Sequence, residues 1–386
     1  MSLYTRLIAR GVKKRGWKLQ LLTTKSTIND PSFKLVHDEV DGQIQVCLMP
    51  EINRLTKTNS MALLYNQFLY FLAIYNGFRL ISYNERPDII YVVNLDECDK
   101  IISLVGSPFG RCPFSGMMMS IKFHRFQMGI SYKGRSDSLL EWSFRRLLKL
   151  KSLYKVAIID ESFIYSSYYD KYIELDKIKF VPDAGYLHGN VSKKQARKSL
   201  GITGESFVVL VYGTLVDRKG IRQLINALIQ SKQNNICILL AGTPNQSITN
   251  FINEKISQDL IQNNKLILNF GYHDDVEECR VFCASDLVWV GYVDGFSDSS
   301  GVLYQAGSVA LPVIATYYGL IGWLVNKYKI GLCCNPHDSF NVMTSILLLM
   351  NDKALYSEYS NNAIQLSSSH TGSMFSDSIL SLCMNK

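Results

Sequence analysis

The sequence predicts an α/β protein with two doubly wound parallel sheets, one in each half of the chain. Continuous apolar runs of strand length alternate with amphipathic helical stretches, which is the pattern of parallel βαβ units. The segment 179–189 (KFVPDAGYLHG) interrupts this pattern with proline, aspartate and glycine, and the alternation restarts after it. A chain of 386 residues is also long enough for two domains of ordinary size.

The first half begins with a helix at 3–15, where apolar residues recur at helical spacing, and a second helix is expected at 139–150. The apolar stretch 61–80 is interrupted by polar residues, so it predicts a buried or interfacial helix and not a membrane span. The strands of this half are expected at 17–24, 87–94, 115–123 and 154–160.

The second half begins with a strand at 206–212 and a helix at 221–231. Its further strands are expected at 236–241, 266–270, 287–290 and 311–316. The tail is expected to return to the first half as a helix, because its apolar residues share one helical face. These features divide the chain into segments 1–180, 181–363 and 364–386.

Composition and charge narrow the function classes. Hydrophobic residues make up 47% of the chain and charged residues 19%, which excludes global disorder. Residues 1–200 carry 30 basic and 18 acidic side chains, a balance of +12, whereas residues 201–386 carry 11 and 15, a balance of −4. The two halves are therefore expected to meet different partners, and a uniformly basic nucleic-acid binder is disfavoured.

The nine cysteines are odd in number and contain no C-x-x-C pair, which indicates reduced thiols in a cytoplasmic protein. Cys279 and Cys283 lie one helical turn apart with His273 nearby, but a fourth ligand at metal-site spacing is missing. Buried core cysteines are therefore expected there, and a zinc site is the alternative. The amino terminus lacks the apolar core of a signal peptide, so secretion is not expected.

The first candidate site is the loop 213–220 (GTLVDRKG), which follows one strand and precedes a helix. Glycines let backbone N–H groups approach an anion, the helix start adds its dipole, and Lys219 adds a positive charge. The spacing matches neither a P-loop nor G-x-G-x-x-G, so an ordinary strand-to-helix turn with a solvated lysine stays open.

The second candidate site is the segment 297–306 (SDSSGVLYQA), where Ser299 or Ser300 could cap a helix and leave N–H groups exposed at its start. A capped helix without a ligand is the alternative. Both helix starts follow parallel strands, so they are expected to face one crevice at the carboxyl edge of the sheet. Together, the two helix starts favour a nucleotide diphosphate as the ligand.

Over residues 181–335 the sequence resembles retaining glycosyltransferases of family 4, which have the GT-B fold of two doubly wound Rossmann-like domains facing across a cleft. The loop 213–220 resembles the family's G-R-L-x-x-x-K-G loop, and 305–315 (QAGSVALPVIA) resembles its E-A-M-A-C-G-L-P-V-I-A segment. Gly271, Tyr272 and the segment 284–286 (ASD) fall at the family's positions between them.

The resemblance implies a donor-binding second half, an acceptor-binding first half, and retaining transfer from a UDP- or GDP-sugar without an obligatory metal. Lys219 would then neutralise the leaving diphosphate, N–H groups near Gly301 would hold its oxygens, and Gln305 would contact ribose. The donor contacts implied by the resemblance are Gly213, Thr214, Arg218, Lys219, Tyr272, Ser300, Gly301, Val302, Leu303 and Gln305.

The sequence departs from the family pattern at three places. The loop arginine is Thr214 here, and the two family glutamates fall on Ser297 and Gln305. Asp298, or Asp294 in the segment 294–296 (DGF), would replace the missing sugar contact, and Asp298 is the residue we expect. Family members begin with a strand and a glycine-rich loop, which a helix follows. The start of this chain resembles that helix.

On the acceptor side, His124 is the nearest match to a histidine that family members often place near the reaction centre. A surface histidine, or one satisfied by its neighbours, is the alternative. We therefore expect Asp298 and His124 as the catalytic pair.

The resemblance and the charge balance lead to an expected function. The chain is expected to be a hexosyltransferase-type enzyme of bacterial surface polysaccharide synthesis that acts on a glycan or a lipid-linked acceptor. A catalytically inactive GT-B partner protein is the alternative, because of Thr214, Ser297 and Gln305. The basic first half could attach to an anionic membrane at its inner, cytoplasmic face, mainly through charge. Nucleic acid is not expected, since no RNA-binding motif is present.

Overall fold

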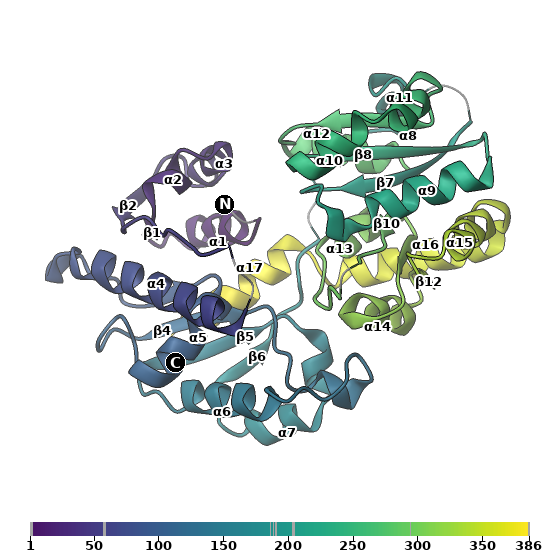
Figure 1. Ribbon diagram of the computed structural model, residues 1–386. Helices are drawn as coiled ribbons and strands as arrows, with labels where there is room; N and C mark the ends of the chain where they lie inside the picture. Colours follow the sequence, from purple (N-terminus) through teal and green to yellow (C-terminus); the bar gives the residue numbers. More distant parts are fainter. Residues whose placement is uncertain are drawn as a thin grey trace. The chain divides into compact units, whose positions relative to one another are not determined.

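A computed structural model of the chain describes residues 3–56, 59–185, 187, 189, 191–202, 205–293 and 295–384 (Figure 1). The chain divides into two compact units. The first comprises Met1–Pro182 and Gly372–Lys386, and the second comprises Asp183–Thr371. Each unit holds a parallel sheet flanked by helices, so the α/β class predicted from the sequence is confirmed.

The main sheet of the first unit has four parallel strands in the order β3-β4-β5-β6. They are β3 (Ile90–Val92), β4 (Phe114–Met118), β5 (Leu153–Ile158) and β6 (Ile178–Phe180). The helices of this unit are α1 (Leu3–Lys14), α2 (Lys25–Ile28), α3 (Pro31–Glu39), α4 (Ser60–Arg79), α5 (Asp99–Val105), α6 (Asp137–Leu148), α7 (Ser167–Ile173) and α17 (Gly372–Ser381). Phe114 and Val156 of the strands pack with Phe78 and Leu147 of the helices in one core.

Two expectations for this unit differ from the structure. One sheet was expected, but β1 (Leu19–Thr23) and β2 (Ile44–Leu48) form a separate two-stranded parallel sheet. The strand expected at 115–123 ends at Met118, because the next N–H, that of Met119, donates to the Asp96 carboxylate at 2.6 Å and not to a neighbouring strand.

The second unit has a six-stranded parallel sheet in the order β12-β11-β10-β7-β8-β9. The strands are β7 (Phe207–Tyr212), β8 (Ile236–Gly242), β9 (Leu266–Phe270), β10 (Leu287–Val290), β11 (Val313–Thr316) and β12 (Gly331–Cys334). The chain builds the sheet outward from β7, first through β8 and β9 and then through β10, β11 and β12. The switch point of the sheet therefore lies between β7 and β10, where doubly wound sheets bind ligands.

The second unit's sheet is covered on both faces, which explains the continuous apolar strands. All seven residues of β8 are buried. Alternate strand residues such as Val209 and Ile238 pack with Leu224 and Ile346, which lie on α9 and α15. The helices of this unit are α8 (Lys193–Ser199), α9 (Ile221–Ser231), α10 (Gln246–Ile252), α11 (Lys255–Gln262), α12 (Asp275–Cys283), α13 (Val302–Ser308), α14 (Gly319–Tyr328), α15 (Ser339–Asn351) and α16 (Lys353–Ser368).

The last helix, α17, belongs to the first unit and packs on α1, as the yellow and purple helices of Figure 1 show. The rings of Tyr4 and Phe375 stack with centroids 5.1 Å apart. The helices approach so closely at Gly11 that a Cβ there would lie 1.9 Å from the Ser376 Oγ. All nine cysteines are free thiols. Within the described residues, no helix is long and apolar enough to cross a bilayer.

Candidate functional site

The candidate site lies at the carboxyl edge of the second unit's sheet, where the loops after β7, β8 and β9 are bonded together. The Leu215 N–H donates to the Thr243 carbonyl at 2.9 Å, and the Gly271 N–H donates to the Gly242 carbonyl at 3.1 Å. Gly242 has φ +129°, and a Cβ there would lie 2.0 Å from the Gly213 carbonyl oxygen. Only glycine fits this crossing of two loops.

Lys219 ends the short 3-10 helix Asp217–Lys219 in the loop after β7. Its ammonium donates to the Tyr212 carbonyl at the end of that strand and lies 6.0 Å from the centroid of the Tyr292 ring. Desolvation and the neighbouring Arg218 lower the pKa of Lys219 to about 8. No carboxylate among the described residues pairs with this ammonium. The site therefore holds a desolvated cation whose charge an anionic ligand would balance.

The loop after β10 lies against the loop that carries Lys219. The Trp289 indole N–H donates to the Lys219 carbonyl at 3.0 Å, and the Val293 N–H donates to the Arg218 carbonyl at 2.8 Å. The Arg218 guanidinium lies 5.1 Å from the Phe296 ring centroid, and Phe296 stacks on Tyr292 with centroids 4.2 Å apart. The switch point is thus lined by two cationic side chains and two aromatic rings.

Helix α13 starts beside this loop, with Gly301 as its N-cap. The expectation that Ser299 or Ser300 caps it is wrong, since no side chain caps this helix. The Ser300 hydroxyl instead bonds the Tyr292 hydroxyl at 3.2 Å. The buried Ser299 Oγ has no hydrogen-bond partner. The first turn, Val302 onward, keeps N–H groups without a side-chain acceptor.

Gln305 is buried in α13, and its amide donates to the Glu278 carboxylate of α12 at 2.6 Å. Glu278 also bonds the Tyr212 hydroxyl, and burial together with this carboxylate raises the pKa of Tyr212 far above its usual range. Sequence reasoning did not single out Glu278. Its only signal is an acidic run, 274–278 (DDVEE), which by itself reads as a charged first turn of a helix.

The other sequence-predicted residues lie in the same unit. Thr214 and Arg218 are exposed, and Tyr272, in the loop after β9, is 54% exposed. Asp298 is half-buried, as is Ser297, whose carbonyl accepts from the Leu320 N–H at 3.0 Å. Asp294 lies outside the described residues. The structure thus gathers the predicted donor residues on the loops after β7, β9 and β10 and on α13.

His124 belongs to the first unit, in the loop after β4, and is fully buried. Its Nε2 lies 2.7 Å from the Ser162 Oγ, and the Ser162 hydroxyl donates to Asp160 at 2.5 Å. Arg125 donates to the other Asp160 oxygen at 2.8 Å. Burial lowers the pKa of His124 to about 4, which keeps the ring neutral at pH 7. Because its ring presents no surface to a ligand in this structure, its catalytic role stays a prediction.

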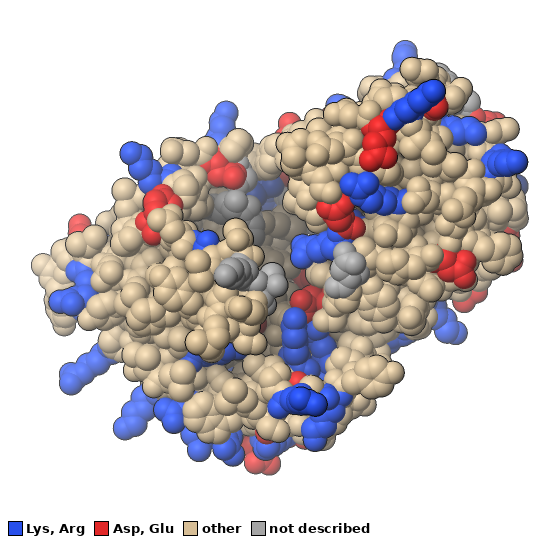
Figure 2. Space-filling view, in the orientation of Figure 1, with Lys and Arg blue, Asp and Glu red and all other residues tan. Residues whose placement is uncertain are grey.

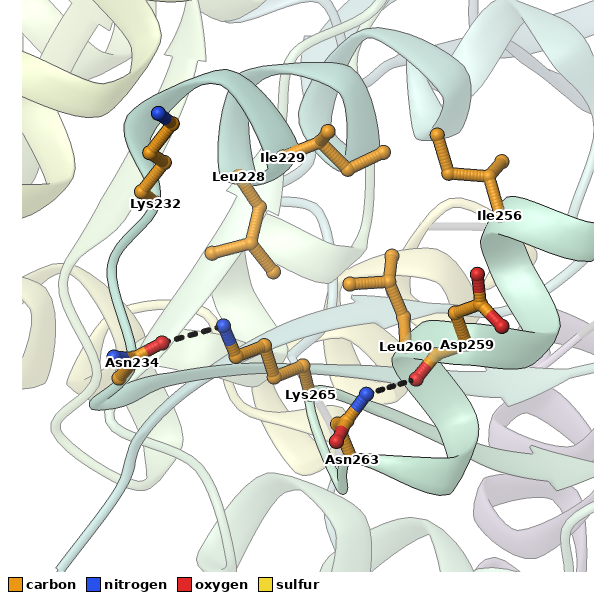
Figure 3. Close-up of a pocket in the computed structure, with 9 residues that line it drawn as sticks. All are labelled: Leu228, Ile229, Lys232, Asn234, Ile256, Asp259, Leu260, Asn263 and Lys265. Carbon is orange, nitrogen blue, oxygen red and sulfur yellow. Dashed lines mark hydrogen bonds between the residues drawn. The ribbon is translucent and has the colours of Figure 1, made fainter.

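A pocket of about 370 Å³ lies at the opposite edge of the second unit's sheet (Figure 3). Leu228 and Leu260 line it, and at one end the Lys265 ammonium donates to the Asn234 side chain at 2.6 Å. Asn234 and Lys265 precede β8 and β9, so this pocket is at the amino ends of the strands. It is separate from the switch-point site. Within the described ranges, no group of three or more His, Cys, Asp or Glu could hold a metal ion.

The family profile described as glycosyl transferases group 1 matches residues 192–366. This segment is therefore similar to the glycosyl transferases group 1 family. The match spans β7 to β12 and includes Lys219, Glu278 and Gln305. Among curated protein sequences, no significant match is found.

The glycosyl transferases group 1 region sits in a chain whose whole length resembles solved GT-B structures. Anabaena HepE, in complex with UDP, has 16% identity and a TM-score of 0.65, with 99% of this chain and 96% of that chain covered. Sucrose-phosphate synthase from Thermosynechococcus elongatus has 16% identity and a TM-score of 0.66, with coverage of 99% and 92%. The lipopolysaccharide glycosyltransferase WaaG has 14% identity and a TM-score of 0.64, with coverage of 99% and 95%. These likenesses confirm the predicted GT-B fold class.

Proposed function

We propose that the chain is a retaining glycosyltransferase that transfers a hexose from a nucleotide-diphosphate sugar to a glycan or lipid-linked acceptor. The observation that carries this proposal is the Lys219 ammonium at the switch point, which is desolvated and pairs with no described carboxylate. A diphosphate supplies the missing negative charge. The group 1 family match and the UDP-glucose bound to the structurally similar HepE support this ligand class.

In this proposal the leaving diphosphate lies between the loops after β7 and β10. Lys219 neutralises its developing charge, assisted by Arg218, and the N–H groups of Gly301 and Val302 donate to its oxygens, whereas the Leu303 N–H donates to the Ser300 carbonyl at 3.1 Å. Gly213 and Thr214 allow the phosphates to approach the backbone, and Ser300 faces the same loop. Fixed donors and cations of this kind act on charge as it forms, so no metal is required for their role.

The base and ribose then lie toward α12 and the loop after β9. Tyr272 offers an exposed ring there for the base, which we expect to be uracil or guanine. Gln305 itself donates to Glu278, so its amide holds that carboxylate in place. We propose that Glu278 accepts the ribose hydroxyls and thus supplies the carboxylate that residue 305 lacks.

Replacing Glu278 by glutamine is expected to weaken nucleotide binding roughly tenfold, because a neutral amide replaces a charged acceptor of hydroxyl donors. Isothermal titration with UDP and with GDP measures this change. Glu277→Gln, at the neighbouring position, is the matched control, since Glu277 bonds Asn269 and Arg280 outside this network. Equal effects of the two variants would contradict the assignment to Glu278.

Two further residues carry the proposed contacts to the sugar and to the acceptor. Asp298 takes the place of the family's sugar-binding glutamate, and His124 serves on the acceptor side once its loop gives substrate access. The acceptor is a glycan or lipid-linked intermediate of bacterial surface polysaccharide synthesis, and the reaction takes place in the cytoplasm at the inner face of the membrane. Positions 1–200 carry 30 basic and 18 acidic residues, and this excess of positive charge supports such a location.

A panel of UDP- and GDP-sugars, followed by NMR of released sugar and nucleotide, tests this function. We expect one donor to be hydrolysed slowly and the released sugar to keep its anomeric configuration. Tight nucleotide binding without turnover of any donor would instead favour the inactive partner protein, which the substitutions Thr214 and Ser297 also suggest. Failure to bind any nucleotide would contradict both the proposed transferase and the inactive partner protein.

A further inference from the structure

Helix α4 carries large apolar side chains on its outer face as well as on the face that packs on the core, although Asn76 and Arg79 are also exposed. Its inner face contributes Phe71, Ile74 and Phe78 to the core of the first unit. Helices of soluble proteins normally place polar residues on the side away from the core, and a helix apolar on all sides is normally surrounded by protein or lipid. The outer face of α4 breaks this rule.

The outer face carries large apolar side chains at helical spacing. We call this set the α4 stripe: Met61, Leu64, Tyr65, Phe68 and Tyr75, which are 77%, 38%, 48%, 42% and 36% exposed. Leu80 and Tyr83, just beyond the helix, extend it with 80% and 83% exposure. Because a helix rises about 1.5 Å per residue, the stripe from Met61 to Tyr75 runs for about 21 Å of the 20-residue helix.

Within α4 the only charge is positive, and beyond the helix the exposed Glu85 lies next to Arg86. The helix contains no acidic residue, and Arg79 is its sole charged side chain. The Arg79 guanidinium lies over the Tyr75 ring at 5.5 Å, and that of Arg86 lies over the Tyr83 ring at 5.6 Å. Neither arginine forms an ion pair with a described residue. Cations beside tyrosine rings at the end of an apolar stripe are typical of residues at a membrane interface.

The α4 stripe is also held in a fixed orientation. Asn59 caps the helix by accepting from the Ala62 N–H at 2.9 Å. On the inner face, the buried Gln67 donates to the Asp96 carbonyl at 2.7 Å and to the Asp99 carboxylate at 2.9 Å. The two Gln67 bonds join the inner face of α4 to the segment after β3 and oppose rotation of the helix about its axis. The exposed side chains therefore need a partner outside this unit's core.

We propose that the α4 stripe inserts into the interfacial region of a lipid bilayer that carries anionic headgroups. The apolar side chains enter the acyl boundary, the tyrosine hydroxyls stay at headgroup level, and Arg79 and Arg86 meet lipid phosphates. A second copy of the chain would cover the apolar side chains but would bring no carboxylate of α4 to these arginines. This inference does not depend on the donor chemistry of the second unit.

The α4 stripe adds an apolar mode to the charge-driven attachment that the sequence predicts. Figure 2 shows Lys and Arg side chains along the lower edge of the first unit, beside α6 and α7, whereas the surface over α4 is largely without charge. Attraction by the basic side chains weakens as salt screens it, because the Debye length falls from about 10 Å at 0.1 M to about 3 Å at 1 M. Insertion of the α4 stripe is expected to persist at high salt.

Co-sedimentation of the full chain with vesicles tests the proposal. The probes are vesicles of phosphatidylcholine alone and of phosphatidylcholine with phosphatidylglycerol, each at 0.1 M and 1 M NaCl. We expect wild-type protein to bind the anionic vesicles at both salt concentrations. The double variant Leu64→Glu/Phe68→Glu is expected to lose about tenfold or more in partitioning at 1 M NaCl, since two large apolar side chains no longer enter the bilayer.

The matched control is Phe340→Glu/Leu348→Glu on α15, where the two side chains are 81% and 44% exposed. We expect this control to bind vesicles like wild type. The tryptophan fluorescence of a Phe68→Trp variant should be quenched by brominated lipid more than that of the wild type, which reports insertion without a loss of binding. Equal partitioning of both double variants, loss of all wild-type binding at 1 M NaCl, or dimers that the Leu64→Glu/Phe68→Glu variant alone disrupts would each overturn the proposal.

Discussion

Replacing Phe375 by alanine is expected to lower the free energy of unfolding of the first unit by about 3–5 kcal/mol. Phe375 is fully buried, and its ring stacks on that of Tyr4, so its truncation leaves a cavity between α17 and α1. Helix α17, near the end of the sequence, packs on α1 (Leu3–Lys14). Loss of the Phe375 ring should therefore loosen α1 as well as α17. Urea unfolding followed by circular dichroism measures the stability change.

The adjacent Met374→Ala variant is the matched control, because Met374 is 44% exposed on the same helix. We expect it to cost less than about 1 kcal/mol. Hydrogen exchange should locate the effect, with faster exchange in peptides of α1 and α17 for Phe375→Ala and unchanged exchange in β7 and β8. Equal destabilisation by the two variants would show that α17 does not pack on α1 through this face.

The second unit's strands could be predicted from the sequence because they are buried on both faces. Runs such as 206–212 (SFVVLVY) contain only residues that suit a parallel sheet, and β7 occupies Phe207–Tyr212. Strands with a weaker signal were not predicted. β2 (IQVCL) includes a polar residue, and β12 (GLCC) includes glycine and cysteine, both unusual in strand patterns. β2 and β12 form strands because each pairs with a neighbouring strand of its sheet, and the local sequence does not show this pairing.

The candidate site was predictable where function depends on local sequence. The glycines and Lys219 of the loop after β7 lie within eight residues, so their convergence follows from one strand-to-helix connection. Glu278 could not be found in this way. It meets Gln305 across 27 positions of sequence, and only the folded chain brings the two side chains together. The burial of His124 depends likewise on Phe163 and Ser162 from another loop.

The outer face of α4 shows a different limit. The sequence predicted a buried or interfacial helix at 61–80, because an apolar helix in isolation does not reveal how many of its sides are covered. The structure places Phe71 and Phe78 in the core and leaves Phe68 and Tyr75 exposed. This distinction decides between a core helix and an interaction surface, and it required the positions of the neighbouring strands.

Replacing Lys219 by methionine is expected to weaken nucleotide binding by about 1.5–3 kcal/mol, or roughly 10- to 150-fold in Kd. The methionine keeps the apolar stem but removes the charge that the diphosphate neutralises. Isothermal titration with UDP and GDP measures the change. Lys255→Met, at an exposed position on α11, is the matched control and should bind like wild type. Unchanged nucleotide affinity in a folded Lys219→Met protein would contradict the assignment of this site.

The pH dependence of binding gives an independent readout of the same residue. The pKa of Lys219 in the free protein is about 8, and a bound diphosphate favours the protonated ammonium. Nucleotide affinity of the wild type should therefore fall as the pH rises from about 7 to 9, while the phosphates stay fully ionised because their last pKa is about 6. The Lys219→Met variant should show no such fall. A variant that binds weakly yet keeps the wild-type pH profile would show that another group, and not the Lys219 ammonium, titrates against the nucleotide.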